Sequence, residues 1–128
     1  MSDDYEELKE LTKKTAKNLF GERMPEGVNA YEIWKSFDPE LAKHLSMFYT
    51  GRLYGREVIS QKQRELCAVA VLTVLHMPDE LKAHCIAAMN VGANKEEVAE
   101  VIFQTTTYHG VPTMLEGLKV LKEVIETE

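Results

Sequence analysis

Apolar side chains recur every three or four positions along almost the whole chain, and no run of alternating apolar and polar residues is long enough for a strand. This spacing is the period of an amphipathic helix. It predicts helices over residues 3–20, 31–37, 39–55, 61–77, 78–92 and 95–109, and a last helix after Gly110-Val111-Pro112. We therefore expect an all-α fold of six or seven helices.

Residues that favour helix starts lie at the predicted boundaries. A capping side chain satisfies free N–H groups of a first turn, and Glu or Gln three positions later completes a capping box. Ser60 with Gln63 and Asn94 with Glu97 have this spacing, and Asp38 precedes Pro39 at a first helical position, where no backbone donor is needed. Residues 21–28 contain Pro25 and two glycines and are typical of a linker. We divide the chain into an N-terminal helical arm and linker, residues 1–28, and a helical domain, residues 29–128.

The most apolar predicted helix covers residues 61–77. After Arg64-Glu65 it is apolar on nearly every side, and a helix of this kind is usually covered by other elements. The chain has 128 residues, which is the usual size of one domain. We therefore expect this helix at the centre of a single compact core.

Composition and charge exclude several classes of protein. Hydrophobic residues make up 45% of the chain and Gly and Pro are few, unlike a collagen-like or disordered chain. The formal net charge is −6 and no block of Lys and Arg is present, so we expect no nucleic-acid partner. The start lacks the pattern of a secretory signal, and the longest apolar run, residues 66–75, is too short to cross a bilayer. We expect a cytoplasmic protein with no membrane partner.

The two cysteines, Cys67 and Cys85, lie in apolar surroundings and have neither a CxxC nor a zinc-ligand spacing. The pattern favours reduced, buried thiols and predicts no metal site. A disulfide between the two cysteines is the alternative.

Polar residues that interrupt the apolar helices are the candidates for chemistry. Glu65 has Val69, Leu72 and His76 at its i+4, i+7 and i+11 positions, which form an otherwise apolar stripe. A carboxyl group buried in that stripe would suit a general acid or base. A solvated Glu65 that only favours the helix N-terminus is the alternative.

Glu80 and His84 have i, i+4 spacing, which places both side chains on one helix face. They could pair as a proton relay, because imidazole titrates near neutral pH. An exposed surface pair is the alternative.

The segment from Thr105 to Pro112 is unusual, with three threonines inside a helix followed by Tyr108 and His109 before a Gly-Pro turn. Tyr108 and His109 could line a pocket at this helix end. We expect His44 to be exposed, and His76 to lie at the edge of the core and bond to backbone groups.

Several segments of the helical region form a recognisable set. They are Arg64-Glu65-Leu66, Leu81-Lys82-Ala83-His84, Ala88-Met89-Asn90-Val91-Gly92-Ala93, Glu97-Val98, Val101-Ile102-Phe103-Gln104 and Tyr108-His109-Gly110-Val111-Pro112. With these segments, residues 37–124 resemble the carboxymuconolactone decarboxylase family, which shares its fold with alkylhydroperoxidase D. The resemblance implies an alkylhydroperoxidase D-like helical fold and ring-like homo-oligomers, trimers or hexamers, with pockets near the subunit contacts.

The resemblance also separates two branches of the family. Peroxidase-type members carry Glu, eleven residues, Cys, two residues, Cys, three residues and His. Here Glu65 and His84 stand at the outer positions, whereas Met77 and Glu80 replace the two cysteines. Decarboxylase-type members tend to carry an acidic residue at the position of Glu80. The resemblance therefore implies the decarboxylase branch.

The implied activity is cofactor-independent decarboxylation of γ-carboxymuconolactone, in the β-ketoadipate pathway of aromatic catabolism. Loss of carbon dioxide leaves a carbanion that the unsaturated lactone delocalises, so no metal or prosthetic group is required. We assign His84, polarised by Glu80, as the proton donor, and Glu65 as a second acid/base or orienting group. Candidates for binding the small anionic substrate are Tyr108, His109, Tyr54, Arg64, Arg52, Arg56 and Lys82.

Two alternatives stay open. One is a redox protein of the peroxidase branch, and the other is a non-catalytic small-molecule-binding assembly module. His109 stands where decarboxylase-like members usually carry a smaller residue, so the substrate could differ from that of the family's name.

Overall fold

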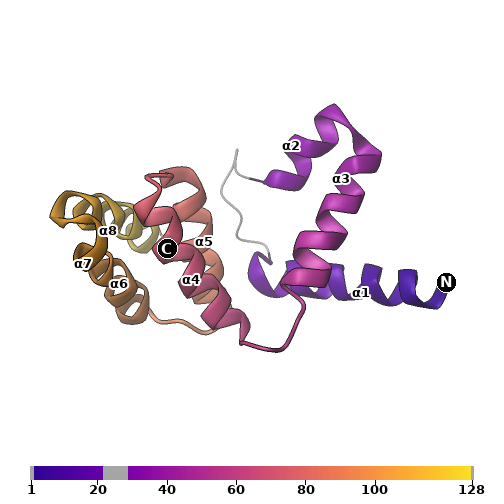
Figure 1. The fold of residues 1–128 in the computed structure, drawn as a ribbon, viewed down its shortest axis with the longest axis horizontal. Coiled ribbons are helices and arrows are strands. Elements are labelled where there is room, and N and C mark those ends of the chain that lie inside the picture. Colours follow the sequence, from indigo (N-terminus) through magenta and orange to yellow (C-terminus); the bar gives the residue numbers. More distant parts are fainter. Residues whose placement is uncertain (1, 22–28, 128) are drawn as a thin grey trace. The chain divides into compact units, whose positions relative to one another are not determined.

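The computed structural model describes residues 2–21 and 29–127, and over these ranges it contains helices and no strand. The elements are α1 (Ser2–Leu19), α2 (Ala30–Phe37), α3 (Pro39–Ser46), the π-helix η1 (Met47–Leu53), α4 (Gln61–Val74), α5 (Pro78–Asn90), α6 (Lys95–Gln104), α7 (Thr106–His109) and α8 (Val111–Glu126). The all-α prediction is therefore confirmed (Figure 1). Of the predicted linker, residues 22–28 lie outside the described residues.

The chain forms two compact units, residues 1–59 and residues 60–128, where the sequence predicts a single core. The boundary also differs from the division after residue 28, because α1 packs against η1 within the first unit (Figure 1). Gly51 allows this close packing: a Cβ atom there would lie 2.2 Å from Thr12 Oγ1 and 2.9 Å from Leu8 Cδ1. The predicted N-terminal arm and the first helices of the predicted helical domain therefore belong to one unit.

The first unit has a small core. Its buried apolar side chains among the described residues are Leu19, Ala42 and Met47, and α2 buries none of its residues. Several aromatic and aliphatic side chains of the unit are exposed, and Phe37 is 88% exposed. Because burial of apolar surface is the main favourable term in folding, this unit has little to stabilise it alone.

The larger core belongs to the second unit and is built by α4, α5, α6 and α8. Its buried members are Val69, Leu81, Cys85, Ile86, Ala88, Ala93, Val98, Ile102, Val120, Leu121 and Val124. The helix predicted over residues 61–77 packs against α5, α6 and α8, and α5 likewise packs against α4, α6 and α8. α5 buries six of its residues and α4 buries three, and Val71 on α4 and Leu75 at its C-cap are exposed. Three of the six buried residues of α5 are alanines, so α5 is the more completely buried of the two helices.

The predicted helix starts are confirmed. Ser60 and Gln63 form a reciprocal capping box at α4, as do Asn94 and Glu97 at α6. The Asp38 side chain accepts a hydrogen bond from the backbone N–H of Leu41 at the start of α3.

Two helix ends differ from the predicted boundaries. α4 ends at Val74, and the turn that follows holds His76 at a φ of 57°, where its N–H donates to the Thr73 carbonyl and the Met77 N–H donates to the Leu72 carbonyl. These two bonds define a Schellman turn, whose left-handed position is usually glycine. The predicted helix over residues 95–109 is broken at Thr105, whose hydroxyl donates to the Ile102 carbonyl at 2.6 Å and competes with the helical bonding pattern.

Candidate functional site

The central contact of the candidate site joins α4 to α5. Glu65, in the first half of α4, places its Oε1 2.6 Å from Nδ1 of His84, in the middle of α5. The Glu65 side chain is completely buried, whereas that of His84 is 25% exposed. Because α4 and α5 pack along their length, two residues nineteen positions apart in the sequence become neighbours. The solvated alternative for Glu65 is therefore wrong.

The contact fixes the chemistry of the imidazole. When Glu65 is ionised, its carboxylate accepts a hydrogen bond, so Nδ1 of His84 is the protonated donor. Nε2 is then the nitrogen that gains or loses a proton in acid–base chemistry. Oε2 of Glu65 is buried and accepts no hydrogen bond from the described residues. The pair thus joins a buried acid to a partly exposed base, which is a common arrangement in sites that move protons.

Glu80 does not make the contact predicted for it. Its side chain is exposed and forms no hydrogen bond or ion pair with the residues that the structure describes. His84 is instead paired with Glu65. The i, i+4 spacing predicted the shared helix face, but the longer-range contact across the α4–α5 interface could not be read from spacing within one helix.

The basic residues of the second unit lie in different surroundings. Lys62 Nζ lies 2.6 Å from Glu97 Oε2, and this contact, with a hydrogen bond from the backbone N–H of Asn94 to Glu97 Oε1, lowers the pKa of Glu97. Arg64 precedes Glu65 on α4 and is partly buried, and Lys82 on α5 is also partly buried. Of the predicted substrate-binding cations, Arg64 is the nearest in sequence to the pair.

Tyr108 and His109 lie at the far end of the second unit in α7. Tyr108 is 76% exposed. His109 Nδ1 lies 2.8 Å from Thr113 Oγ1 on α8, and the rings of His109 and His76 pack edge to face with centroids 5.3 Å apart. His109 therefore belongs to a second polar cluster, and no contact in the described part of the chain joins Tyr108 or His109 to Glu65 and His84.

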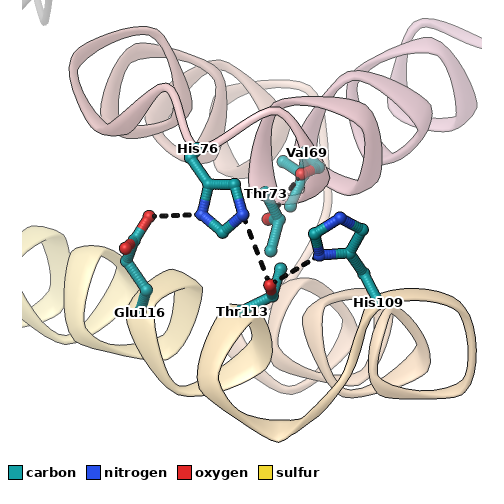
Figure 2. A network of polar contacts seen from close by, with 6 residues as sticks. All are labelled: Val69, Thr73, His76, His109, Thr113 and Glu116. Atoms are coloured by element: carbon teal, nitrogen blue, oxygen red, sulfur yellow. Dashed lines mark hydrogen bonds and ion pairs between the residues drawn. The ribbon is translucent and has the colours of Figure 1, made fainter.

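The second cluster includes residues that the sequence analysis missed (Figure 2). His76 Nδ1 lies 3.1 Å from Glu116 Oε1, and its Nε2 lies 3.4 Å from Thr113 Oγ1. His76 thus bonds to side chains, and the expected bonding to backbone groups is wrong for its ring. Thr113 and Glu116 are three positions apart on α8, which indicates a shared face, but their contacts with His76 and His109 join separate elements and could not be read from spacing.

The remaining predicted residues fall outside both clusters. Tyr54, Arg52 and Arg56 belong to the first unit, so their roles in substrate binding stay predictions. His44 is exposed as expected, with its Nε2 3.5 Å from Glu40 Oε1.

The two cysteines are free thiols in different environments. Cys85 is buried, as predicted, and burial raises the pKa of its thiol to about 12. Cys67 is exposed, so the prediction that it is buried is wrong. The described residues contain no group of three or more His, Cys, Asp or Glu placed to hold a metal ion. Within the same residues, no helix has both the length and the apolar character that a membrane crossing requires.

Comparison with known proteins identifies the family of this chain. Residues 39–123 match the carboxymuconolactone decarboxylase family, a span that contains α3 to α7 and most of α8. The chain is therefore a member of the carboxymuconolactone decarboxylase family.

Two relatives show how far the similarity extends. The chain is 30% identical over 95 residues to 4-carboxymuconolactone decarboxylase of Acinetobacter baylyi (strain ATCC 33305 / BD413 / ADP1), covering 74% of this chain and 71% of the relative. It is also 30% identical over 93 residues to an uncharacterized 15.0 kDa protein encoded in the nqo9-nqo10 intergenic region of Paracoccus denitrificans, covering 70% of this chain and 69% of that protein.

Proposed function

We propose that this protein is a cofactor-independent carbon–carbon lyase that decarboxylates a small carboxylated lactone, as in aromatic catabolism through β-ketoadipate. The observation that carries the proposal is the 2.6 Å contact between the buried Glu65 carboxyl group and the partly exposed His84 imidazole. Similarity to a 4-carboxymuconolactone decarboxylase supports the choice of substrate class.

His84 is the proton donor in this proposal. The bond between the ring and the carboxylate of the substrate breaks, carbon dioxide leaves, and the electron pair delocalises into the unsaturated lactone. A proton from Nε2 of His84 then adds to the carbanion carbon, and His84 recovers a proton from water. Glu65 orients the ring and stabilises its protonated form as a hydrogen-bond acceptor at Nδ1.

The substrate is a small anion, so a cation is needed beside His84. Arg64 and Lys82 are the candidates within the second unit, because Arg64 adjoins Glu65 in α4 and Lys82 lies two positions before His84 in α5. Arginine offers a planar, two-pronged donor that matches a carboxylate. We therefore assign the substrate carboxylate to Arg64. The substrate contacts predicted for Tyr54, Tyr108 and His109 are not part of this proposal, because Tyr54 belongs to the first unit and no contact among the described residues joins the other two to Glu65 and His84.

The test is carbon dioxide release from enzymatically generated γ-carboxymuconolactone. We expect His84→Ala and Glu65→Gln each to lower kcat by about 100-fold or more, the usual contribution of a positioned acid or base. His44→Ala and Glu100→Gln are the matched controls, since both residues are exposed and remote in sequence from the pair. Circular dichroism spectra establish that every variant is folded. No release by the folded wild-type protein would reject this substrate.

A substitution of Glu80 distinguishes the partner of His84 predicted from the sequence, Glu80, from the partner found in the structure, Glu65. If Glu80 polarises His84, Glu80→Gln should reduce kcat as strongly as Glu65→Gln. Because Glu80 is exposed and His84 contacts Glu65, we expect Glu80→Gln to lower kcat by less than about 10-fold, a value typical of a screened surface charge.

The redox alternative has little support in the arrangement of thiols. Met77 and Glu80 occupy the two cysteine positions of the peroxidase branch, while Cys67 is exposed on α4 and Cys85 is buried on α5. The non-catalytic alternative predicts that His84→Ala leaves the biological activity unchanged.

We also propose that the protein is a homo-oligomer, with trimers and hexamers as the expected states. The support is the first unit, whose α2 buries no residue and whose apolar side chains are exposed at Tyr31, Ile33, Phe37, Leu41, Phe48 and Tyr49. Sedimentation at micromolar concentration should give a mass several times 14.6 kDa. A monomer would contradict the proposal.

A further inference from the structure

The second polar cluster is a continuous chain of four side chains that runs Glu116, His76, Thr113, His109 (Figure 2). We call it the His76–His109 chain. Its members come from the turn after α4, from α7 and from α8. No contact among the described residues joins these four side chains to Glu65 or His84. The chain is therefore a separate feature from the Glu65–His84 pair.

The number of protons fixes the direction of each hydrogen bond. An ionised Glu116 can only accept, so Nδ1 of His76 donates to it and Nε2 of a neutral His76 carries a lone pair. A hydroxyl has one proton, which Thr113 gives to that lone pair. Thr113 Oγ1 then accepts from Nδ1–H of His109. Nε2 of the exposed His109 is left with a lone pair and makes no hydrogen bond to the described residues.

A proton added at that lone pair can cross the chain. His109 gains a proton at Nε2 and passes its Nδ1 proton to Thr113 Oγ1. Thr113 passes its own proton to Nε2 of His76. His76 becomes an imidazolium that donates at both nitrogens, to Glu116 and to Thr113, and His109 is neutral again. Among the described residues, Glu116 is the charged side chain that contacts His76. The positive charge on His76 therefore lies next to the Glu116 carboxylate.

Burial decides the role of Thr113. The order Glu116, His76, Thr113 is that of a carboxylate–imidazole–hydroxyl triad, in which the hydroxyl attacks a substrate. Thr113 is only 3% exposed, so its hydroxyl is not presented to a substrate carbonyl. It is instead placed to relay a proton between the two imidazoles.

The backbone sets the position of the His76 ring. His76 has a φ of 57° because it occupies the left-handed position of the Schellman turn that ends α4. This turn directs the His76 ring towards Glu116 and Thr113 (Figure 2).

We propose that His109 is the general base of a second site, that its proton is relayed through Thr113 to His76, and that the site takes a small aromatic weak acid such as a phenol. The aromatic preference rests on the exposed side chains of Tyr108 and Val111 on either side of the His109–Gly110 pair. The proposal is independent of the proposed decarboxylase activity.

The first test is nitrogen NMR of the histidine rings at alkaline pH. We expect the wild-type protein to show the Nδ1–H tautomer at both His76 and His109, because the partner of one ring nitrogen sets the tautomer. Thr113→Val removes the hydroxyl and should abolish the Nδ1–H preference of His109. Thr113→Ser is the matched control and should retain it, and the His44 signal should not change. An Nε2–H tautomer at His109 of the wild-type protein would overturn the proposal.

The second test uses 4-nitrophenol, whose ionised form is measured by its absorbance. The protein should bind the probe and increase its ionised fraction near neutral pH. His109→Gln and Thr113→Val should weaken this binding by about tenfold, whereas Thr113→Ser should not. His84→Ala should leave it unchanged, which separates this site from the lyase site. Equal ionisation by the wild-type protein and by His109→Gln would refute the second site.

Discussion

His84 Nδ1 lies 2.6 Å from Glu65 Oε1, and the carboxyl group of Glu65 has no exposed surface. A buried carboxylate is costly unless a partner compensates its charge, and the cost appears when the partner is removed. The pair is therefore both the candidate catalytic centre and a determinant of stability.

The stability of the second unit should depend on the pair as a whole. We expect His84→Ala to lower the free energy of unfolding by about 3 kcal/mol, because it leaves Glu65 buried without its partner. Combining it with Glu65→Met should restore part of that loss, since an apolar side chain of similar size suits a buried position. Urea unfolding followed by circular dichroism measures both effects. If the double variant were no more stable than His84→Ala, the claim that Glu65 is a buried charge left without its partner would be contradicted.

The cysteines should differ in reactivity. Burial raises the pKa of Cys85 to about 12, so almost none of its thiol is ionised at pH 8, whereas Cys67 is exposed. Titration of the native protein with a thiol reagent should modify Cys67 alone, and unfolding in urea should release the second thiol. A Cys67→Ser variant gives the control, because its native form should not react. Rapid native modification of Cys85 would contradict its burial.

Gly117 should be required for the packing of α8. A Cβ atom there would lie 2.8 Å from Thr73 Cγ2 and 2.9 Å from Ile102 Cγ2, and both neighbours are buried. Overpacking of this kind costs about 1–3 kcal/mol, while the gain in helix propensity is about 1 kcal/mol. We expect Gly117→Ala to lower the unfolding free energy by about 1 kcal/mol. Glu123→Ala, at an exposed position of the same helix, should change it by less than about 0.5 kcal/mol.

The contact between Lys62 and Glu97 should make a pH-dependent contribution to stability. The Lys62 ammonium and the Asn94 N–H lower the pKa of Glu97 in the folded state below its ordinary value of 4.5. The contribution is therefore present above pH 4.5 and is lost as the pH falls through the lower, folded pKa.

Lys62→Gln should raise the pKa of Glu97 towards 4.5, measured by the chemical shift of its carboxyl carbon. The neighbouring exposed Lys95→Gln is the control. An unchanged titration in Lys62→Gln would contradict the cause given for the shift.

The sequence predicts the helices well because their ends carry local signals. The capping boxes at Ser60 and Asn94 are formed by residues three positions apart, so they can be recognised before any tertiary contact is known. The break at Thr105 was missed, because a threonine inside a helix bonds to the preceding carbonyl only in some contexts. The two units were missed because composition does not show which helices pack together.

The candidate site, like the fold, could be predicted from the sequence only in part. The family pattern singled out Glu65 and His84 at their correct spacing, but the predicted partner of His84 was Glu80, which shares its helix. The contact with Glu65 depends on how α4 and α5 pack, and the chain of His76, Thr113 and His109 joins three elements. Long-range contacts of this kind leave no periodic signal in the sequence.

The most direct test of the central claim is the rate of carbon dioxide release from γ-carboxymuconolactone by the wild-type protein and by folded Glu65→Gln. The account predicts release by the wild type and a loss of about 100-fold or more in kcat for the variant. Equal rates in the two proteins would contradict a catalytic role for the pair.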